Sequence, residues 1–171
     1  MGKKIGAEYF KNSCHFCVWA PFVENMELLL KGHPSIPLQK RSSGYWSITV
    51  DIPVNSLYKF KIDKLKLPDP ASHFQPEGVH SWSQVVSKEY PWDDDSWKGM
   101  STAEMVIYEL HVGTFSHEGT FEGVKKRLSH FKELGVNTLE IMPIAQCPGS
   151  RNWGYDGVML FAPAHSYGTP D

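Results

Sequence analysis

The sequence predicts an antiparallel β-sandwich followed by an α/β segment that begins with a strand, a helix and a second strand. Three observations support this fold class. Short runs of alternating apolar and polar residues, separated by turn residues, occupy positions 5–86, which is typical of a sandwich. Around 91–101 the composition becomes acidic and polar. Beyond that stretch the apolar pattern changes to a continuous run, a helical period and a second short run.

Period-two alternation predicts four strands of the sandwich, at 16–20, 26–30, 46–50 and 58–62. Proline, glycine and serine separate these runs and favour turns, including a hairpin turn at 42–44. We therefore predict no helix before residue 90. The alternation assigns to the core Phe16, Val18, Ala20, Met26, Leu28, Leu30, Trp46, Ile48, Val50, Tyr58, Phe60 and Ile62, and to the solvent His15, Cys17, Trp19, Lys59, Lys61 and Asp63.

A proline-rich stretch at 68–82 follows the last of these strands. It contains three prolines and a glycine, yet it also carries the large apolar side chains of Phe74, Val79 and Trp82. Because such side chains are costly to leave in water, the stretch is predicted to be an ordered loop that packs on another part of the protein, and not a free linker.

The domain boundary is predicted where the composition changes. Several aspartates, with Trp92 and Trp97 spaced among them, mark this region. The chain is therefore divided into a sandwich domain at 1–90, a linker at 91–103 and a second unit at 104–171.

The second unit has the pattern of a strand, a helix and a strand. Met105–Phe115 is a nearly continuous apolar strand, Thr120–Leu134 carries apolar residues at helical spacing, and Thr138–Ile144 is a second strand. Thr120 is placed to cap the start of the helix and Gly135 its end. The two strands should be parallel and joined by a right-handed crossover.

Charge and cysteine content exclude several classes of function. The 17 basic and 19 acidic residues are mixed along the chain, so we expect no nucleic-acid or membrane partner. No stretch is as apolar as a signal peptide or a membrane span, and we expect a cytoplasmic protein. Cys14 and Cys17 point to opposite faces of one strand, and Cys147 is expected to be a free thiol. We therefore expect no metal site and no cofactor.

Four short motifs follow one another in the second unit: Tyr108–Phe115 (YELHVGTF), Gly119–Gly123 (GTFEG), Glu140–Ile144 (EIMPI) and Asn152–Gly157 (NWGYDG). Together, in this order, they resemble the first barrel segments of the alpha-amylase superfamily. The loop before them has the sequence PDPAS and then QPEGVH. Within that superfamily, this loop is similar to that of the glycosyltrehalose (maltooligosyltrehalose) trehalohydrolases.

The resemblance covers nearly the whole chain. It implies an immunoglobulin-like (early-set) sandwich, similar to carbohydrate-binding modules, followed by the opening βαβ unit of an incomplete (β/α)8 TIM barrel. Two positions depart from the family pattern: His73 stands where an arginine is expected, and Ser81-Trp82 where Gly-Pro is expected. These departures leave the fold prediction unchanged and put identical substrate contacts in doubt.

The family's activity implies a role in trehalose biosynthesis and carbohydrate metabolism. Such a glycoside hydrolase releases trehalose from maltooligosyltrehalose by cleaving an α-1,4-glucosidic bond, with retention through two carboxylates. Those carboxylates lie at the ends of later barrel strands, and a barrel needs roughly 200 residues. We therefore expect no catalytic residue in this chain, which would be an inactive N-terminal fragment. Glu109 and Glu140 lie inside the predicted strands, where a structural role is expected.

The resemblance also implies a substrate-binding site in the second unit. It places Tyr155 against the sugar ring at the cleavage point, where a planar side chain stacks on the apolar face of glucose. Trp153 would form an apolar wall, and Asp156 would accept hydrogen bonds from sugar hydroxyls. His111, near the end of the first strand, is a further candidate for ligand contact. Loop packing is the competing interpretation for all four residues.

Three hypotheses for function stay open. The first is the trehalohydrolase fragment, with maltooligosaccharide or maltooligosyltrehalose as its ligand. The second is a non-catalytic module that binds α-glucan or a partner protein, and the third is a fragment of a glycogen branching or debranching enzyme. Because 105–115 and 138–144 have open edges, we also predict that they pack on the sandwich or pair with a second chain as a homo-oligomer.

Overall fold

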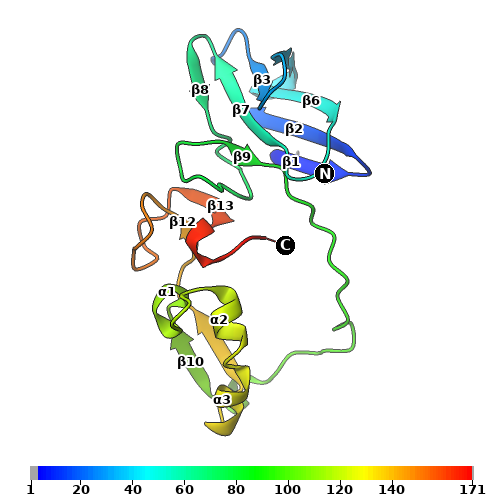
Figure 1. Ribbon diagram of the computed structural model, residues 1–171. Coiled ribbons are helices and arrows are strands. Elements are labelled where there is room, and N and C mark those ends of the chain that lie inside the picture. The colour runs from blue at the N-terminus through cyan, green and yellow to red at the C-terminus, as the bar shows by residue number, and fades with distance from the viewer. Residues whose placement is uncertain (1–3, 171) are drawn as a thin grey trace.

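A β-sandwich occupies one end of the protein and a small α/β unit the other, with an antiparallel strand pair between them (Figure 1). The computed structural model describes residues 4–170. A long extended segment runs along one side and carries the chain from the sandwich to the α/β unit. The predicted order of a sandwich before an α/β segment is confirmed.

The sandwich consists of two antiparallel sheets. The first has the strand order β1 (Gly6–Phe10), β2 (Ser13–Trp19), β6 (Tyr45–Asp51) and β5 (Gln39–Lys40). The second has the order β4 (Ile36–Pro37), β3 (Glu27–Leu30), β7 (Leu57–Ile62) and β8 (Leu65–Leu67), and β9 (Ser83–Gln84) also pairs with β7.

The core lies between the two sheets and uses the alternating residues that the sequence indicated. Phe16 of β2 meets Tyr58 of β7 edge to face, with 4.8 Å between the ring centroids. Trp46 is 4% exposed, and its indole Nε1 donates to the carbonyl of Ala20. The alternation failed at Cys17, which was assigned to solvent but is buried. It lies on an inner strand, opposite Gly6 on one side and Ser47 on the other.

The parallel pair β10 (Ile107–Leu110) and β11 (Thr138–Ile141) begins the α/β unit and confirms the predicted βαβ pattern. The first strand is shorter than predicted, because the chain turns at His111 into the one-turn helix α1 (Val112–Phe115). The backbone amides of Thr114 and Phe115 donate to the carbonyl of His111. The prediction of a single strand over Met105–Phe115 was wrong at its end, because Phe115 lies in α1. Its ring stacks on that of Phe131, with 5.0 Å between the ring centroids.

Two helices stand where one was predicted: α2 (Phe121–Lys125) and α3 (Leu128–Glu133). The amide of Arg127 donates to the carbonyl of Val124, three residues back, and Arg127 then leaves the helical region at φ −102° and ψ 7°. Both predicted caps are confirmed. Thr120 accepts from the amide of Gly123, and Gly135, at φ +79°, donates to Lys132 while the next amide donates to Phe131.

The antiparallel pair β12 (Ala145–Gln146) and β13 (Met159–Pro163) was not predicted. The second predicted strand ends at Ile141, and the chain then bends before it pairs with β13. Single 3-10 turns complete the described structure: η1 (Ser42–Gly44) at the predicted hairpin turn, η2 (Thr102–Glu104) and η3 (His165–Tyr167).

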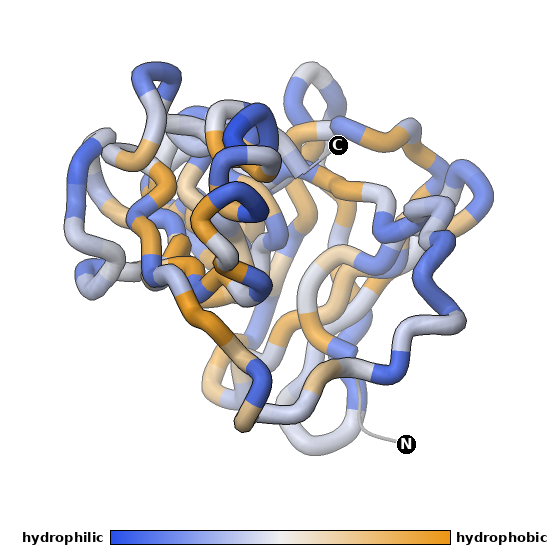
Figure 2. The backbone as a smooth tube through the Cα atoms, turned by 90° about the horizontal axis from the view of Figure 1, so that it is seen from below, coloured by the Kyte–Doolittle hydropathy of each residue, from blue (hydrophilic) through white to orange (hydrophobic). Residues whose placement is uncertain are grey.

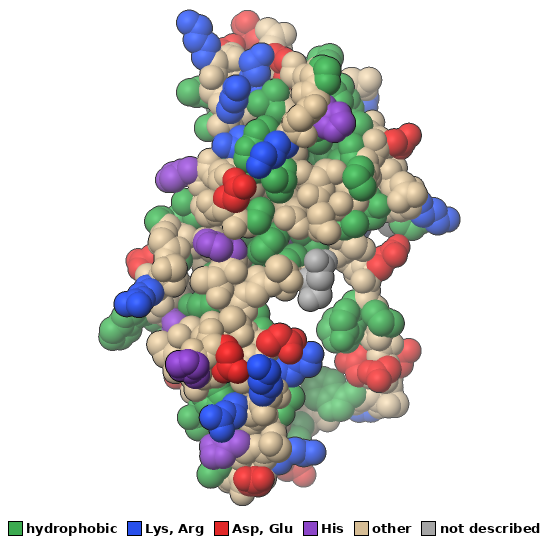
Figure 3. Space-filling view, viewed as in Figure 1, with side chains coloured by type: hydrophobic (Ala, Val, Ile, Leu, Met, Phe, Trp, Pro, Cys, Tyr) green, Lys and Arg blue, Asp and Glu red, His purple; other side chains and the backbone are tan. Residues whose placement is uncertain are grey.

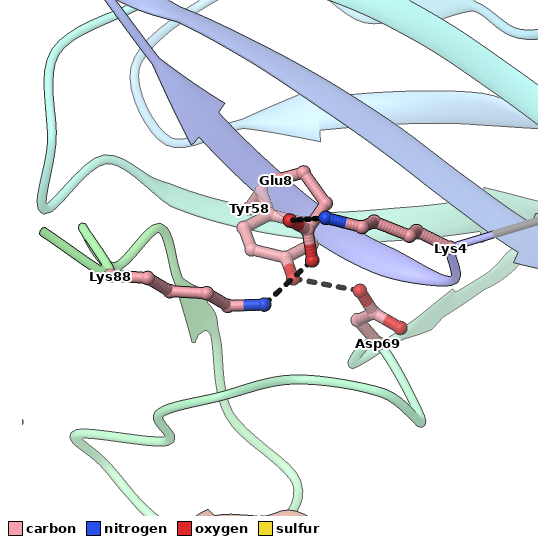
Figure 4. A network of polar contacts seen from close by, with 5 residues as sticks. All are labelled: Lys4, Glu8, Tyr58, Asp69 and Lys88. Atoms are coloured by element: carbon pink, nitrogen blue, oxygen red, sulfur yellow. Dashed lines mark hydrogen bonds and ion pairs between the residues drawn. The ribbon is translucent and has the colours of Figure 1, made fainter.

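The proline-rich loop is ordered, as predicted, and Asp69 holds it to the sandwich (Figure 4). The carboxylate of Asp69 is fully buried and accepts the Tyr58 hydroxyl at 2.7 Å and the Ala71 amide at 2.9 Å. Burial raises the pKa of Asp69 to about 6, although both hydrogen bonds favour the charged form. On its other side the loop packs on the strand pair, because Val79 shares an apolar cluster with Met159 and Ala162.

An ion pair joins the segment that leaves the sandwich to strand β1 (Figure 4). The ammonium of Lys88 lies 2.6 Å from a carboxylate oxygen of Glu8, and Lys4 lies 3.6 Å from the other oxygen. Residues 85–101 form no helix or strand. Three large aromatic side chains of this segment are exposed, namely Tyr90, Trp92 and Trp97, and Figure 3 shows hydrophobic side chains at the surface of the protein. The exact domain limits stay a prediction.

Apolar stretches in the described chain are short and are separated by hydrophilic ones (Figure 2). Among residues 4–170, no helix combines the length and apolar character that crossing a bilayer requires. The same residues bring no three His, Cys, Asp or Glu side chains together in a way that would hold a metal ion. Cys14, Cys17 and Cys147 are all buried.

Candidate functional site

A cleft of about 710 Å³ opens where the parallel strands β10 and β11 end. His111 follows the first strand, Met142 follows the second, and Tyr167 comes from η3. Residues 150–153 close a further side. The carboxyl ends of parallel strands are where α/β folds bind their ligands, and a volume of this size accommodates a small sugar.

His111 is the most connected side chain of the cleft. Its Nε2 lies 2.8 Å from the carbonyl oxygen of Asn152 and 3.2 Å from the hydroxyl of Tyr167. Because a carbonyl oxygen only accepts, Nε2 carries a hydrogen. On the other side of the ring, Nδ1 lies 3.4 Å from the hydroxyl of Thr114. The imidazole therefore has polar contacts at both of its nitrogens.

Gly113 leaves room for the rings of His111 and Tyr167 on the same wall of the cleft. A Cβ placed on Gly113 would lie 2.9 Å from the ring of Tyr167 and 3.1 Å from that of His111. These two rings meet edge to face at 5.8 Å. The glycine of the HVGTF motif therefore lets the His111 and Tyr167 rings lie against bare backbone.

The turn after the cleft wall is held by Asn152. Its side-chain oxygen accepts the amide of Gly154, and its side-chain amide contacts the sulfur of Cys147. Gly154 has φ +95°, and a Cβ there would lie 2.3 Å from the carbonyl oxygen of Pro143. This close approach fixes how the Trp153–Asp156 turn leaves the barrel segment.

Replacing Gly154 with alanine is expected to displace the turn, because the strained backbone is joined by a clash with Pro143. We expect a loss of about 2–3 kcal/mol in the free energy of unfolding, measured by urea denaturation. Gly149→Ala is the matched control, since Gly149 also has positive φ (+75°) but open space around it. Its cost should stay near 1 kcal/mol. Equal losses in the two variants would show that the clash is absent.

The structure brings two of the four predicted site residues to the cleft. His111 and Trp153 line it, and Trp153 is 79% exposed at its mouth. Tyr155, 70% exposed, and Asp156, also exposed, follow Gly154 and do not line the cleft. Their roles stay predictions. Glu109 and Glu140 are exposed, lie opposite each other in the parallel pair and are outside the cleft.

Sequence reasoning missed Tyr167 and the central position of Asn152. Tyr167 is 4% exposed, and burial, followed by the nearby Cys147 thiol, raises the pKa of its phenol. It remains a neutral hydroxyl that hydrogen-bonds inside the cleft. No periodic signal marks it, because it lies in a 3-10 turn 56 residues after His111. The sequence indicated Asn152 only as the first residue of the NWGYDG motif at 152–157.

The described lining of the cleft consists of groups that can bind a neutral polar ligand. It offers an indole face, a phenol hydroxyl, an imidazole and one guanidinium, that of Arg151. Flat rings and neutral hydrogen-bonding groups bind sugars. Hydrolysis with retention uses two carboxyl groups roughly 5 Å apart, and no carboxylate is among the residues that line this cleft.

Comparison with known proteins identifies similar sequences for both units. The family model for carbohydrate-binding module 48 (isoamylase N-terminal domain) matches residues 4–73. The malto-oligosyltrehalose trehalohydrolase of Saccharolobus solfataricus is 47% identical over 168 residues, which is 97% of this chain. The match covers 30% of the relative, so this chain spans about a third of its length.

Solved structures share the fold over the entire chain. A putative alpha amylase from Salmonella typhimurium superposes with a TM-score of 0.92 and 39% identity, covering 100% of this chain and 30% of its own. A pullulanase from Anoxybacillus sp. LM18-11, solved with maltotetraose, has a TM-score of 0.78 and 26% identity over 99% of this chain and 30% of its own.

Proposed function

We propose, from the premise that this chain resembles the N-terminal part of the malto-oligosyltrehalose trehalohydrolases along nearly its whole length, that it contributes the sandwich and the first cleft wall to such an enzyme. The complete enzyme would release trehalose from maltooligosyltrehalose by cleaving an α-1,4-glucosidic bond. One observation carries the proposal: the 47% identity extends through the sandwich, the extended segment and the cleft.

In this proposal the cleft holds a glucose unit while groups from later strands act on the bond. Trp153 gives a flat apolar surface for a sugar ring, and Tyr155 lies in the same turn. The hydroxyl of Tyr167 can hydrogen-bond a neutral sugar hydroxyl, and His111 lines the same cleft. The carboxylates come from elsewhere in the complete enzyme, so the 171-residue polypeptide alone is expected to bind without cleaving.

A chimera tests the proposal. The matching N-terminal 30% of the Saccharolobus solfataricus relative is replaced by this chain, and trehalose release from maltooligosyltrehalose is measured. Activity within about tenfold of the parent enzyme is expected, because the cleft and its supports come with the segment. In the control, the N-terminal part of a pullulanase is joined to the same remaining part of the parent enzyme. A folded chimera that releases no trehalose would contradict the proposal.

A second candidate function is glucan binding by the sandwich itself, and one observation favours it. Trp19 of β2 is 59% exposed, lies opposite Tyr45 of β6, and is held by a hydrogen bond of 3.0 Å from its indole to the carbonyl of Ser43. An immobilised exposed indole beside a tyrosine is a surface on which sugars stack. Calorimetric titration of residues 1–90 with maltotetraose separates the two functions: affinity equal to that of the full chain places the ligand on the sandwich.

Self-association is a further part of the proposal. The pair β10 and β11 lies away from the sandwich (Figure 1) and exposes apolar side chains, including Val106, Ile107 and Ile141. Such a surface associates readily in water. A cytoplasmic location remains a proposal, and so does the lack of nucleic-acid or membrane partners, which rests on the balance of 17 basic and 19 acidic residues.

A further inference from the structure

We propose that His111 is a positioning residue that sets the place of the Trp153 ring at the cleft mouth, acting through the backbone of Asn152. The proposal rests on the proposed function, because it concerns how the sugar-binding wall is held. It assigns to His111 a role different from direct ligand contact.

The first argument is the exposure of Trp153. With 79% of its surface exposed, the indole has little packing to hold it, and its ring position therefore depends on the backbone that carries it. A long side chain that is free to rotate loses entropy when a ligand binds, whereas a fixed backbone reduces the number of positions available. A rigid turn at 152–154 is the means by which this cleft can present a preorganised ring.

The second argument is that two hydrogen bonds hold this backbone, one on each side of Trp153 in the sequence. The imidazole Nε2 of His111 donates to the carbonyl of Asn152, and the side chain of Asn152 accepts the amide of Gly154. Trp153 lies between these two points. His111 itself is at the end of β10, which is paired with β11, so the turn is tied to the sheet.

The third argument is that His111 is itself immobilised. The ring of Tyr167 lies against it at 84° between ring planes, and both rings rest on the bare backbone of Gly113. The hydroxyl of Tyr167 is 3.2 Å from Nε2. Nε2 has a single hydrogen, and its nearer partner is the Asn152 carbonyl, so the Tyr167 hydroxyl is a longer, secondary polar contact of the same nitrogen. An imidazole held on two sides transmits its position to the turn that it contacts.

The test compares His111→Ala, His111→Gln, Trp153→Ala and the double variant His111→Ala/Trp153→Ala in the 171-residue chain. Affinity for maltotetraose is measured by calorimetry. Each single alanine variant should bind about fivefold to tenfold more weakly, and the double variant should bind no more weakly than Trp153→Ala alone. His111→Gln should keep most of the affinity, because its amide reaches the Asn152 carbonyl. Additive losses, or a glutamine variant as weak as the alanine variant, would overturn the proposal.

A second readout needs no ligand and separates this inference from the proposed function. Amide hydrogen exchange at Gly154 should rise at least tenfold in His111→Ala and return toward the unchanged rate in His111→Gln. If the unchanged chain binds no maltotetraose, the proposed sugar site fails while the exchange result still decides the positioning role. If His111→Ala does not fold, Tyr167→Phe replaces it, with faster exchange confined to 150–157 as the supporting result and unchanged exchange as the contrary one.

Discussion

Replacing Asp69 with alanine should lower the free energy of unfolding by about 2–4 kcal/mol at pH 7. The substitution removes the acceptor of the Tyr58 hydroxyl and of the Ala71 amide inside the sandwich, where Tyr58 and Asp69 are both 0% exposed. Each unpaired buried donor costs about 1–3 kcal/mol, and the release of a buried charge offsets part of that sum. Urea denaturation followed by far-UV circular dichroism measures the change.

Two further variants show whether the hydrogen bonds are responsible. Asp69→Asn keeps an acceptor for the Ala71 amide and should cost less than about 1 kcal/mol. Combining Asp69→Ala with Tyr58→Phe removes both the acceptor and the hydroxyl that it would leave unpaired. The loss in the free energy of unfolding of the double variant should therefore be smaller than the sum of the losses of the two single variants. Strict additivity would mean that the two side chains do not interact.

The same carboxylate should make the protein more stable as the pH falls from 7 to 4. Burial raises the pKa of Asp69 to about 6 from an ordinary value near 3.8. Between these values the folded protein binds a proton that the unfolded chain lacks, so acidification stabilises the fold. The full shift corresponds to roughly 3 kcal/mol, present as a penalty above pH 6 and absent below about pH 4.

Asp69→Asn isolates this effect, because an amide does not titrate. Glu8 affects the pH dependence of stability in the opposite direction. Burial tends to raise the pKa of Glu8, but the hydrogen bond and the charge of Lys88 lower this pKa overall. The stability that ionised Glu8 contributes is therefore lost in acid. Subtracting the Asp69→Asn curve cancels such terms. Relative to Asp69→Asn, the unchanged protein should gain roughly 3 kcal/mol between pH 7 and pH 4, and parallel curves would show that Asp69 does not titrate in this range.

The sandwich was predictable because its chemistry is periodic. One-sided burial imposes alternation on every strand, and Tyr58 and Phe60 alternate with Lys59 and Lys61 as expected. The exceptions have local causes. Cys17 is covered from both neighbouring strands, and 105–115 could not be divided from the sequence because an apolar run carries no period that separates a strand from a following helical turn.

The site was less predictable, because its contacts join residues far apart in the chain. His111 and Trp153 were found from their place in motifs, but the hydrogen bond that links their segments spans 41 residues. Tyr167 and the buried Asp69 lie in irregular segments, where polarity suggests exposure and only the folded contacts reveal burial. Nothing in the local sequence distinguishes them from solvent-facing loop residues.

The contact of Val79 with Met159 and Ala162 limits how freely the sandwich can be exchanged among enzymes of this architecture. A module joined only by a tether can be transplanted whole, whereas this one shares interior packing with a hairpin 80 residues further along the chain. A graft of residues 1–90 onto a foreign barrel would therefore need compatible side chains at 159 and 162. Without them, a cavity would remain between the sandwich and the strand pair, and the two parts would no longer be held in one relative position.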